Sequence, residues 1–164
     1  MINIKFFLLC PIPEDQKPIN EYIGLKENPL TNWTTLSKKY YERQVFSFFL
    51  GSFVLISFFN FSHLEFFDEW LFENLFWACF SFMNFGFLLI FRWSQAQNRF
   101  NNSRLFYEEI SWYDGQVWEK PLSILKNDRL ISSQQIRPIL QRIVRSLFTL
   151  GSWNLVCLLL LLIE

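Results

Sequence analysis

Three long stretches without a fixed charge constrain the fold of this 164-residue chain more than any other feature. They cover residues 45–64, 74–91 and 146–163, so each holds about 18 to 20 residues. A helix of that length crosses the hydrocarbon core of a bilayer, which is about 30 Å thick. A soluble protein would bury three such helices behind amphipathic segments, and too little amphipathic chain remains here. We therefore predict an all-α integral membrane protein with three transmembrane helices.

The positions of the basic residues predict the orientation of these helices. All 15 Lys and Arg residues lie either before residue 45 or between residues 92 and 145. The connection 65–73 contains four carboxylates and no cation. Because Lys and Arg near span ends stay on the cytoplasmic or equivalent side, the N-terminus and the 93–145 loop should share one side of the membrane. The C-terminus should lie on the opposite side, together with an acidic hairpin at 65–73.

This topology divides the chain into an N-terminal strip (1–44), three spans (45–64, 74–92 and 146–163), the acidic hairpin (65–73) and a basic-side loop with helices (93–145). Pro11, Pro13, Pro18 and Pro29 are spaced so that no long helix is expected before Pro29. We predict that the N-terminal strip is extended. It should form a cap with an extramembrane helix and with an amphipathic helix that leads into the last span.

Aromatic and aliphatic residues after the second span recur at roughly helical spacing, from Phe100 through Phe106 and Ile110 to Trp112. This pattern favours a helix that ends near Asp114-Gly115, where glycine suits a helix stop. In the alternative, Asp114-Gly115 is the turn of a hairpin between Trp112 and Val117-Trp118.

The segment before the third span is amphipathic. Its apolar face consists of Ile136, Ile139, Leu140, Ile143, Val144 and Leu147. Pro138 suits the first turn of this helix, or kinks the helix if it starts earlier. Arg137, Arg142 and Arg145 are placed to contact lipid phosphates, and anchoring at the membrane surface accounts for this basic stretch.

The first ten residues do not have the pattern of a cleaved export signal. Their apolar run extends only from Phe6 to Leu9, shorter than a signal core. Glu14, Asp15 and Glu21 come too early for an acid-poor organelle import leader. If the protein works in an organelle, we therefore expect it to be synthesised inside that organelle.

Two regions carry a resemblance to a known family. The segments CPIPEDQKPINEY near the start, then YEEISWYDGQVWEKP and DRLI, resemble a family of hypothetical chloroplast reading frames, number thirty-six. This family also occurs in cyanobacteria and as a nucleus-encoded plastid protein in plants and green algae. The resemblance implies a plastid-encoded, multi-pass membrane protein of the thylakoid, with a stromal N-terminus and a lumenal C-terminus. The family has no established biochemical activity.

The residues that carry this resemblance are our candidates for structural or partner-docking roles: Cys10, Pro11, Pro13, Gln16, Pro18, Glu21, Tyr22, Tyr107, Glu108, Glu109, Trp112, Tyr113, Asp114, Gly115, Trp118, Lys120, Pro121, Asp128, Arg129 and Leu130. In this interpretation Glu108, Glu109 and Asp114 pair with basic side chains, for which Arg99, Arg104, Lys120 and Arg129 are available. Trp112, Tyr113 and Trp118 would lie at headgroup level.

Catalytic and metal chemistry finds little support in the sequence. Glu108 and Glu109 would point about 100° apart on a helix, so they could not act on one face. The chain has a single histidine, His63, at the end of a span, and Cys10 has no second ligand nearby. Zero net charge without a basic excess argues against nucleic-acid binding. We expect no enzymatic activity, no cofactor and no metal.

Three functional hypotheses remain. The first is an auxiliary or assembly factor that docks to a larger photosynthetic membrane complex. The second is a pigment or cofactor binder that uses Asn60, His63, Asn84 or Asn154 as ligands, although small polar residues in spans more often form interhelical hydrogen bonds. The third is a membrane enzyme or transporter, which the absence of charges inside the spans disfavours.

Overall fold

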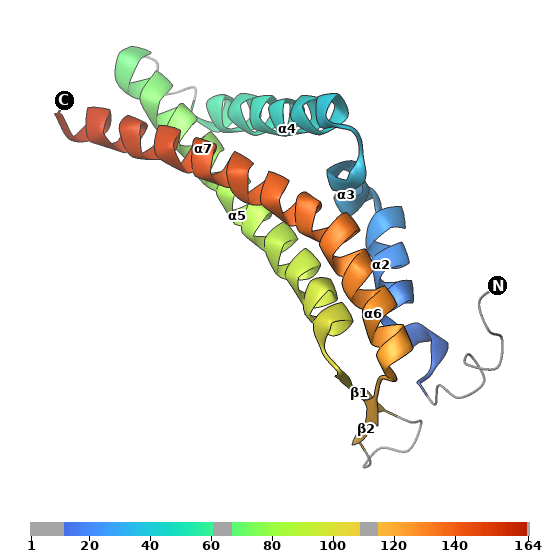
Figure 1. Cartoon of the computed structure of the whole chain (residues 1–164). Coiled ribbons are helices and arrows are strands. Elements are labelled where there is room, and N and C mark those ends of the chain that lie inside the picture. The colour runs from blue at the N-terminus through green and yellow to red at the C-terminus, as the bar shows by residue number, and fades with distance from the viewer. Residues whose placement is uncertain (1–11, 61–66, 109–114, 164) are drawn as a thin grey trace. The chain divides into compact units, whose positions relative to one another are not determined.

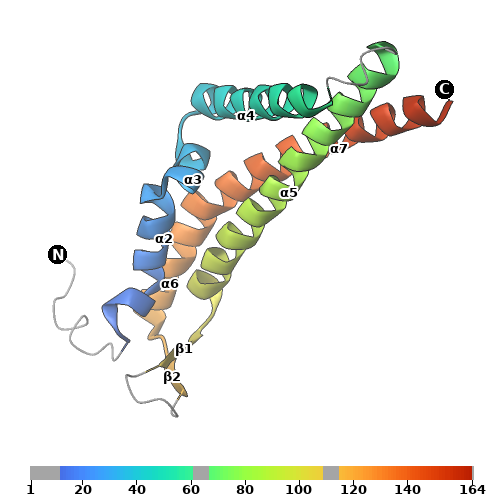
Figure 2. The ribbon, with the colours of Figure 1, turned by 180° about the vertical axis from the view of Figure 1, so that it is seen from behind.

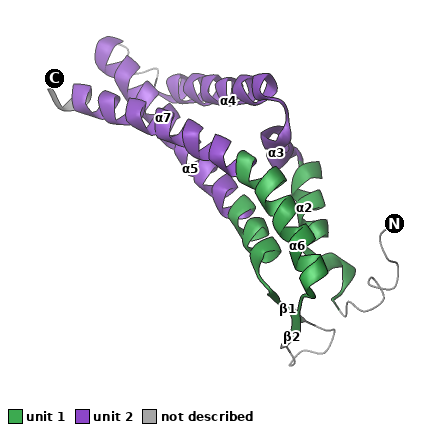
Figure 3. Ribbon diagram, in the orientation of Figure 1, with its two compact units in different colours: residues 1–28, 93–138 green, residues 29–92, 139–164 purple. Residues whose placement is uncertain are grey.

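The computed structural model describes residues 12–60, 67–108 and 115–163 (Figures 1 and 2). The elements are η1 (Glu14–Gln16), α2 (Pro18–Glu27), α3 (Pro29–Asn32), η2 (Trp33–Thr35), α4 (Lys38–Phe59), α5 (Phe67–Asn101), β1 (Arg104–Glu108), β2 (Gly115–Glu119), α6 (Leu122–Ile131), η4 (Ser132–Ile136) and α7 (Arg137–Ile163). Their contacts define two compact units (Figure 3). Unit 1 comprises residues 1–28 and 93–138, and unit 2 comprises residues 29–92 and 139–164.

Within the described residues, three helices are long and apolar enough to cross a membrane. They are α4, α5 and the continuous helix Leu122–Leu160, which runs through α6, η4 and most of α7. The predicted number of apolar helices is therefore confirmed. The first of them starts at Lys38, seven residues before its uncharged window, and ends at Phe59.

The predicted acidic hairpin at 65–73 is largely helical. Helix α5 begins at Phe67, so Asp68 and Glu69 lie in its first turn and Glu73 follows one turn later. Acidic side chains are favourable there because the N-terminal end of a helix carries partial positive charge. The acidic connection thus starts a 35-residue helix that continues past Arg92 to Asn101.

The prediction of an extended N-terminal strip was wrong for residues 18–27. Pro18 is the first residue of α2, where its missing N–H and fixed φ cost nothing. Asn28, which precedes Pro29, is extended and ends the helix. The two prolines therefore bound a ten-residue helix and do not prevent it.

The predicted helix beyond residue 101 was also wrong, and the alternative hairpin is present with a different register. Helix α5 ends at Asn101, and β1 pairs with β2 in antiparallel fashion from Arg104↔Glu119 to Glu108↔Gly115. Gly115, which the alternative placed in the turn, is the first residue of β2 and pairs with Glu108. Leu105 and Tyr107 are buried while Phe106 is exposed, an alternation of period two that overrides the weaker helical spacing.

Pro138 lies inside a continuous helix that starts at Leu122. The five residues of η4, directly before α7, are π-helical. A proline in a helix removes one hydrogen bond and clashes with the carbonyl four residues earlier, which for Pro138 is that of Gln134. The wider π-helical turn relieves this clash. Of the predicted amphipathic face, Ile136, Ile139, Ile143 and Leu147 are buried and Val144 is exposed.

The core of unit 2 brings α5 against α7. Gly86 on α5 packs so closely on Leu147 of α7 that a Cβ atom at Gly86 would lie 2.4 Å from its Cδ2 atom. Phe82 and Leu89 on α5 are buried, as are Ile143 and Leu147 on α7. Close approach at small residues is the usual way in which membrane-type helices gain van der Waals contact.

Candidate functional site

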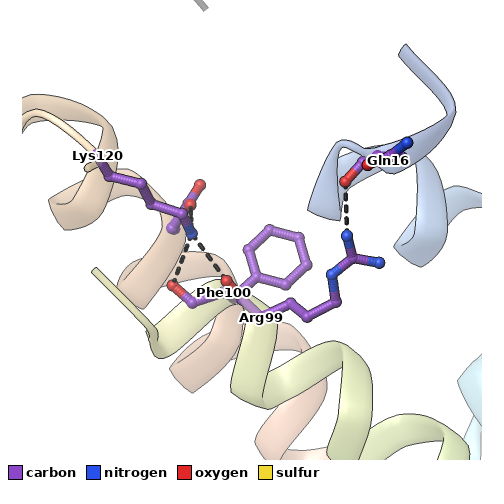
Figure 4. Close-up of polar contacts among 5 residues, drawn as sticks. Gln16, Arg99, Phe100 and Lys120 are labelled. Carbon is purple, nitrogen blue, oxygen red and sulfur yellow. Dashed lines mark hydrogen bonds and ion pairs between the residues drawn. The ribbon is translucent and has the colours of Figure 1, made fainter. Parts of the chain in front are cut away.

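A buried lysine from the segments that carry the family resemblance lies at the end of α5 in unit 1. The Lys120 side chain is 1% exposed, and its Nζ atom lies 2.5 Å from Oδ2 of Asp128. It also donates to the carbonyl oxygens of Arg99 (2.8 Å) and Phe100 (3.3 Å) (Figure 4). An ammonium group has three N–H donors, and these three acceptors account for all of them.

Local sequence explains why Lys120 reaches this position. Arg99 and Phe100 are in the last turn of α5, whose carbonyls have no partner within the helix. The hairpin returns the chain to that point, because the backbone N–H of Lys120 donates to the carbonyl of Ser103 at 2.8 Å. Pro121 then precedes α6, which carries Asp128. The ammonium of Lys120 therefore caps the negative end of α5.

Arg99 links the N-terminal segment to the same helix end. Its guanidinium donates to the carbonyl of Gln16 at 2.8 Å, as Figure 4 shows. It also donates to Oε2 of Glu21 at 3.0 Å. Glu21 is on α2 and Gln16 is the last residue of η1. One side chain therefore fixes both short helices against α5.

An aromatic cluster lies next to this contact. The Tyr22 ring packs edge-on against Trp93, with centroids 6.1 Å apart, and against Phe100 at 6.3 Å. Trp93, Ala96 and Phe100 form a buried face of α5 with helical spacing. Burial raises the pKa of the Tyr22 hydroxyl above its ordinary value. The spacing of Trp93, Ala96 and Phe100 is the sequence signal that could have extended α5 past Arg92.

The hairpin adds a small apolar core of its own. Ile12, Leu105 and Tyr107 are buried together, and Trp118 packs against them. Trp118 therefore helps to form this core, and its position at headgroup level stays a prediction. On the other face of the hairpin, Phe106 and Val117 are directly opposite each other and are 75% and 48% exposed.

Three of the basic side chains considered for these pairs contact other carboxylates. Arg99 pairs with Glu21, Arg104 pairs with Glu119 at 2.8 Å, and Lys120 pairs with Asp128. The side chains of Glu108, Glu109 and Asp114, which we expected as partners, are not among those described. The ion pair between Arg99 and Glu21 joins residues 78 positions apart, so their spacing in the sequence does not predict it.

The structure thus brings together Gln16, Glu21, Tyr22, Lys120 and Asp128 from the predicted set. Pro18 and Tyr107 are buried, Pro13 precedes η1, Pro121 precedes α6, and Arg129 and Leu130 are exposed. Gly115 is described by its backbone in β2. Cys10, Pro11, Glu109, Trp112, Tyr113 and Asp114 lie outside the described residues.

The asparagines considered as cofactor ligands form internal hydrogen bonds in unit 2. Asn60 donates to the side-chain oxygen of buried Asn74 at 3.1 Å, and Trp70 donates to the Asn60 carbonyl at 3.0 Å. Asn154 on α7 donates to the carbonyl of Phe76 on α5 at 3.0 Å. Asn84 donates to the Phe80 carbonyl of its own helix. His63 lies outside the described residues.

In unit 1 the described polar contacts hold the short helices and the hairpin to the end of α5. Its charged groups near the end of α5 are paired with one another, and their donors point at backbone carbonyls. Among the residues that the structure describes, no group of three or more His, Cys, Asp or Glu residues could hold a metal ion.

The described residues define a helical protein with three membrane-length helices. Its unit 1 contains short helices and a hairpin, which hydrogen bonds and ion pairs hold to the end of α5. The chain belongs to the CGLD27-like family (Conserved in the green lineage and diatoms 27), whose model matches residues 10–149. No solved structure matches it.

The chain is similar to the uncharacterized protein ycf36 of Porphyra purpurea, at 37% identity over 87% of this chain and 88% of that one. It is 35% identical to the ycf36 protein of Pyropia yezoensis, over 84% and 86% of the two chains. It is 30% identical to the chloroplastic protein Conserved in the green lineage and diatoms 27 of Arabidopsis thaliana, over 86% of this chain and 44% of that protein.

Proposed function

We propose that this protein is a non-enzymatic, multi-pass membrane protein of the plastid that serves as an auxiliary or assembly factor of a photosynthetic membrane complex. The chloroplastic relative supports the compartment, and the three long apolar helices support insertion in a membrane. We place the protein in the thylakoid, with the N-terminus in the stroma and the C-terminus in the lumen, because all 15 cations then face the stroma.

The exposed face of the hairpin carries the docking part of the proposal. Phe106 and Val117 present adjacent apolar side chains to the outside of unit 1, while the polar groups of the motif are bonded inside it. An apolar pair at the centre of a contact, with the charged pair Arg104–Glu119 beside it, resembles a small hydrophobic core with a polar rim. A protein partner that covers this face would bury both side chains.

The test is co-migration with a large complex on native gels of mildly solubilised membranes. We expect Phe106→Ser with Val117→Ser to shift the protein toward the free form without lowering its amount. A matched control replaces Arg104 and Glu119 by glutamine on the same two strands, and we expect it to co-migrate like the unmodified protein. Free protein alone in every growth state, or unchanged co-migration of the serine variant, would refute the proposal.

A further inference from the structure

A positively charged surface lies in unit 2, where α4 and α7 meet. The Tyr41 hydroxyl on α4 and the Ser146 hydroxyl on α7 are 2.7 Å apart, so the turns around these two residues are adjacent. Arg142 strengthens the contact, since it donates to the Leu36 carbonyl at 2.7 Å and lies 5.4 Å above the Tyr41 ring. Arg142 therefore contacts protein atoms of unit 2, and its predicted contact with lipid phosphates stays a prediction.

The other basic residues of these two turns point outward. Lys38, Lys39 and Arg43 on α4 and Arg145 on α7 are exposed. The one carboxylate in these turns is Glu42, which pairs loosely with Lys38 at 3.8 Å, both side chains being well exposed. Five cations, Arg142 included, against one carboxylate give a local charge of +4. The exposed Lys38–Glu42 pair is weak in water, so it leaves the positive charge of this surface largely available to another anion.

The surface directly beyond these cations is apolar on both helices. Phe46 and Leu50 on α4 and Phe148 on α7 are 64%, 49% and 79% exposed. Tyr40, 60% exposed, lies among the cations. A ring of Lys, Arg and Tyr at the start of exposed apolar helices is typical of the level at which headgroups meet acyl chains.

We propose that Lys38, Lys39, Arg43 and Arg145 form a surface that selects anionic lipid headgroups. The proposal rests on the membrane insertion of unit 2 proposed above, and it adds a lipid class that the docking function does not require. The partner is a diacyl lipid whose headgroup bears one negative charge on a phosphate or sulfonate oxygen. Each lysine or arginine near an anionic surface favours such lipids by Coulomb attraction, which falls off over a Debye length.

The test measures which lipid the purified full-length protein retains. The detergent-solubilised protein is incubated with equal amounts of phosphatidylglycerol and phosphatidylcholine, washed, and the bound lipids are counted by mass spectrometry. We expect phosphatidylglycerol to be enriched about fivefold in low salt and less than twofold in about 0.5 M NaCl, because salt screens the attraction. The variant with glutamine at Lys38, Lys39, Arg43 and Arg145 should lose the enrichment.

A control variant removes the same number of exposed cations from unit 1. It carries glutamine at Lys26, Arg104, Lys126 and Arg129, and it should keep the full enrichment. Equal retention of both lipids by the unmodified protein overturns the proposal, and so does the same loss in both variants, which would reflect net charge alone. Because no complex is present in this assay, failure of docking to a complex cannot produce either result.

Discussion

The ammonium of Lys120 and the carboxylate of Asp128, 2.5 Å apart, form a buried ion pair at the end of α5. Neither group could be buried alone without a large desolvation cost. Because the Lys120 nitrogen also holds two carbonyls of α5, this pair connects that helix end, the hairpin and α6 within unit 1. The stability of unit 1 should depend on it.

Replacing Asp128 by asparagine should destabilise unit 1, because the Lys120 ammonium would then be buried without a counter-charge. The expected loss is about 2 to 4 kcal/mol in the free energy of unfolding, somewhat less than for a fully buried pair because Asp128 is 17% exposed. Thermal unfolding of the solubilised full chain, followed by tryptophan fluorescence, measures this loss. The double variant Lys120→Met with Asp128→Leu should lose less than the sum of the single changes, and strict additivity would contradict the coupling.

Replacing Arg99 by glutamine should loosen the N-terminal helices, because one guanidinium holds both Glu21 and the Gln16 carbonyl. The pair is about one-third exposed, so we expect a loss of only about 1 kcal/mol. Limited proteolysis should show faster cleavage between residues 12 and 28. Arg104→Gln, which breaks an ion pair that is 68% and 69% exposed, is the control and should leave the cleavage rate unchanged.

Replacing Gly86 by alanine should separate α5 and α7 locally. The added Cβ would overlap the buried Leu147 side chain, and such overpacking costs about 1 to 3 kcal/mol. The loss should appear as a lower unfolding temperature, and Leu147→Ala in the same chain should recover part of it. Gly51→Ala on α4 makes the same chemical change with nothing within 4 Å, so it should be neutral. Equal effects at the two glycines would rule out close packing as the cause.

Replacing Asn74 by leucine should weaken the connection between α4 and α5. Asn74 is fully buried, accepts from Asn60 and donates to the Trp70 carbonyl at 2.7 Å. Polar contacts between membrane helices are worth about 0.6 to 1.7 kcal/mol, and we expect a loss in that range. Asn84→Leu, which removes an exposed hydrogen bond within α5 itself, should cost less in the same unfolding assay. The opposite ranking would contradict the role assigned to Asn74.

Protease protection tests the proposed orientation. Tags are placed separately at the two ends of the chain, and intact thylakoids are treated with protease from the stromal side. We expect the N-terminal tag to be digested and the C-terminal tag to survive until the membrane is disrupted, because the cations should remain on the stromal side. Protection of the N-terminal tag, or digestion of both tags, would contradict an odd number of spans with this orientation.

The sequence predicted the helical content of the apolar segments and the family well. The length of an uncharged run is a local property, so a run of about 18 residues predicts a membrane-length helix without knowledge of its tertiary contacts. The motif residues that suggested the family also include Gln16, Glu21, Tyr22, Lys120 and Asp128, which the structure gathers around the end of α5 within unit 1. Which of them contact each other was not predictable, because these contacts join segments that lie far apart in the chain.

Two local predictions failed for the same physical reason. The pattern from Phe100 to Trp112 has roughly helical spacing, yet β1 pairs with β2 there. Pro18 and Pro29 suggested an extended chain, yet α2 forms between them. In both cases the outcome was set by burial of Leu105, Tyr107 and Tyr22 against residues distant in the sequence. Short segments have weak intrinsic preferences that tertiary packing overrides.

The sequence alone determined the long apolar helices, the grouping of its 15 cations outside the three uncharged stretches, and the family. Only the tertiary structure decided which charges are available. It buries Lys120 against Asp128, turns Arg99 and Arg142 onto backbone carbonyls, and leaves Lys38, Lys39, Arg43 and Arg145 exposed. The sequence does not show whether a charged side chain is buried or which group it pairs with. Both are set when segments far apart in the chain pack together and exclude water.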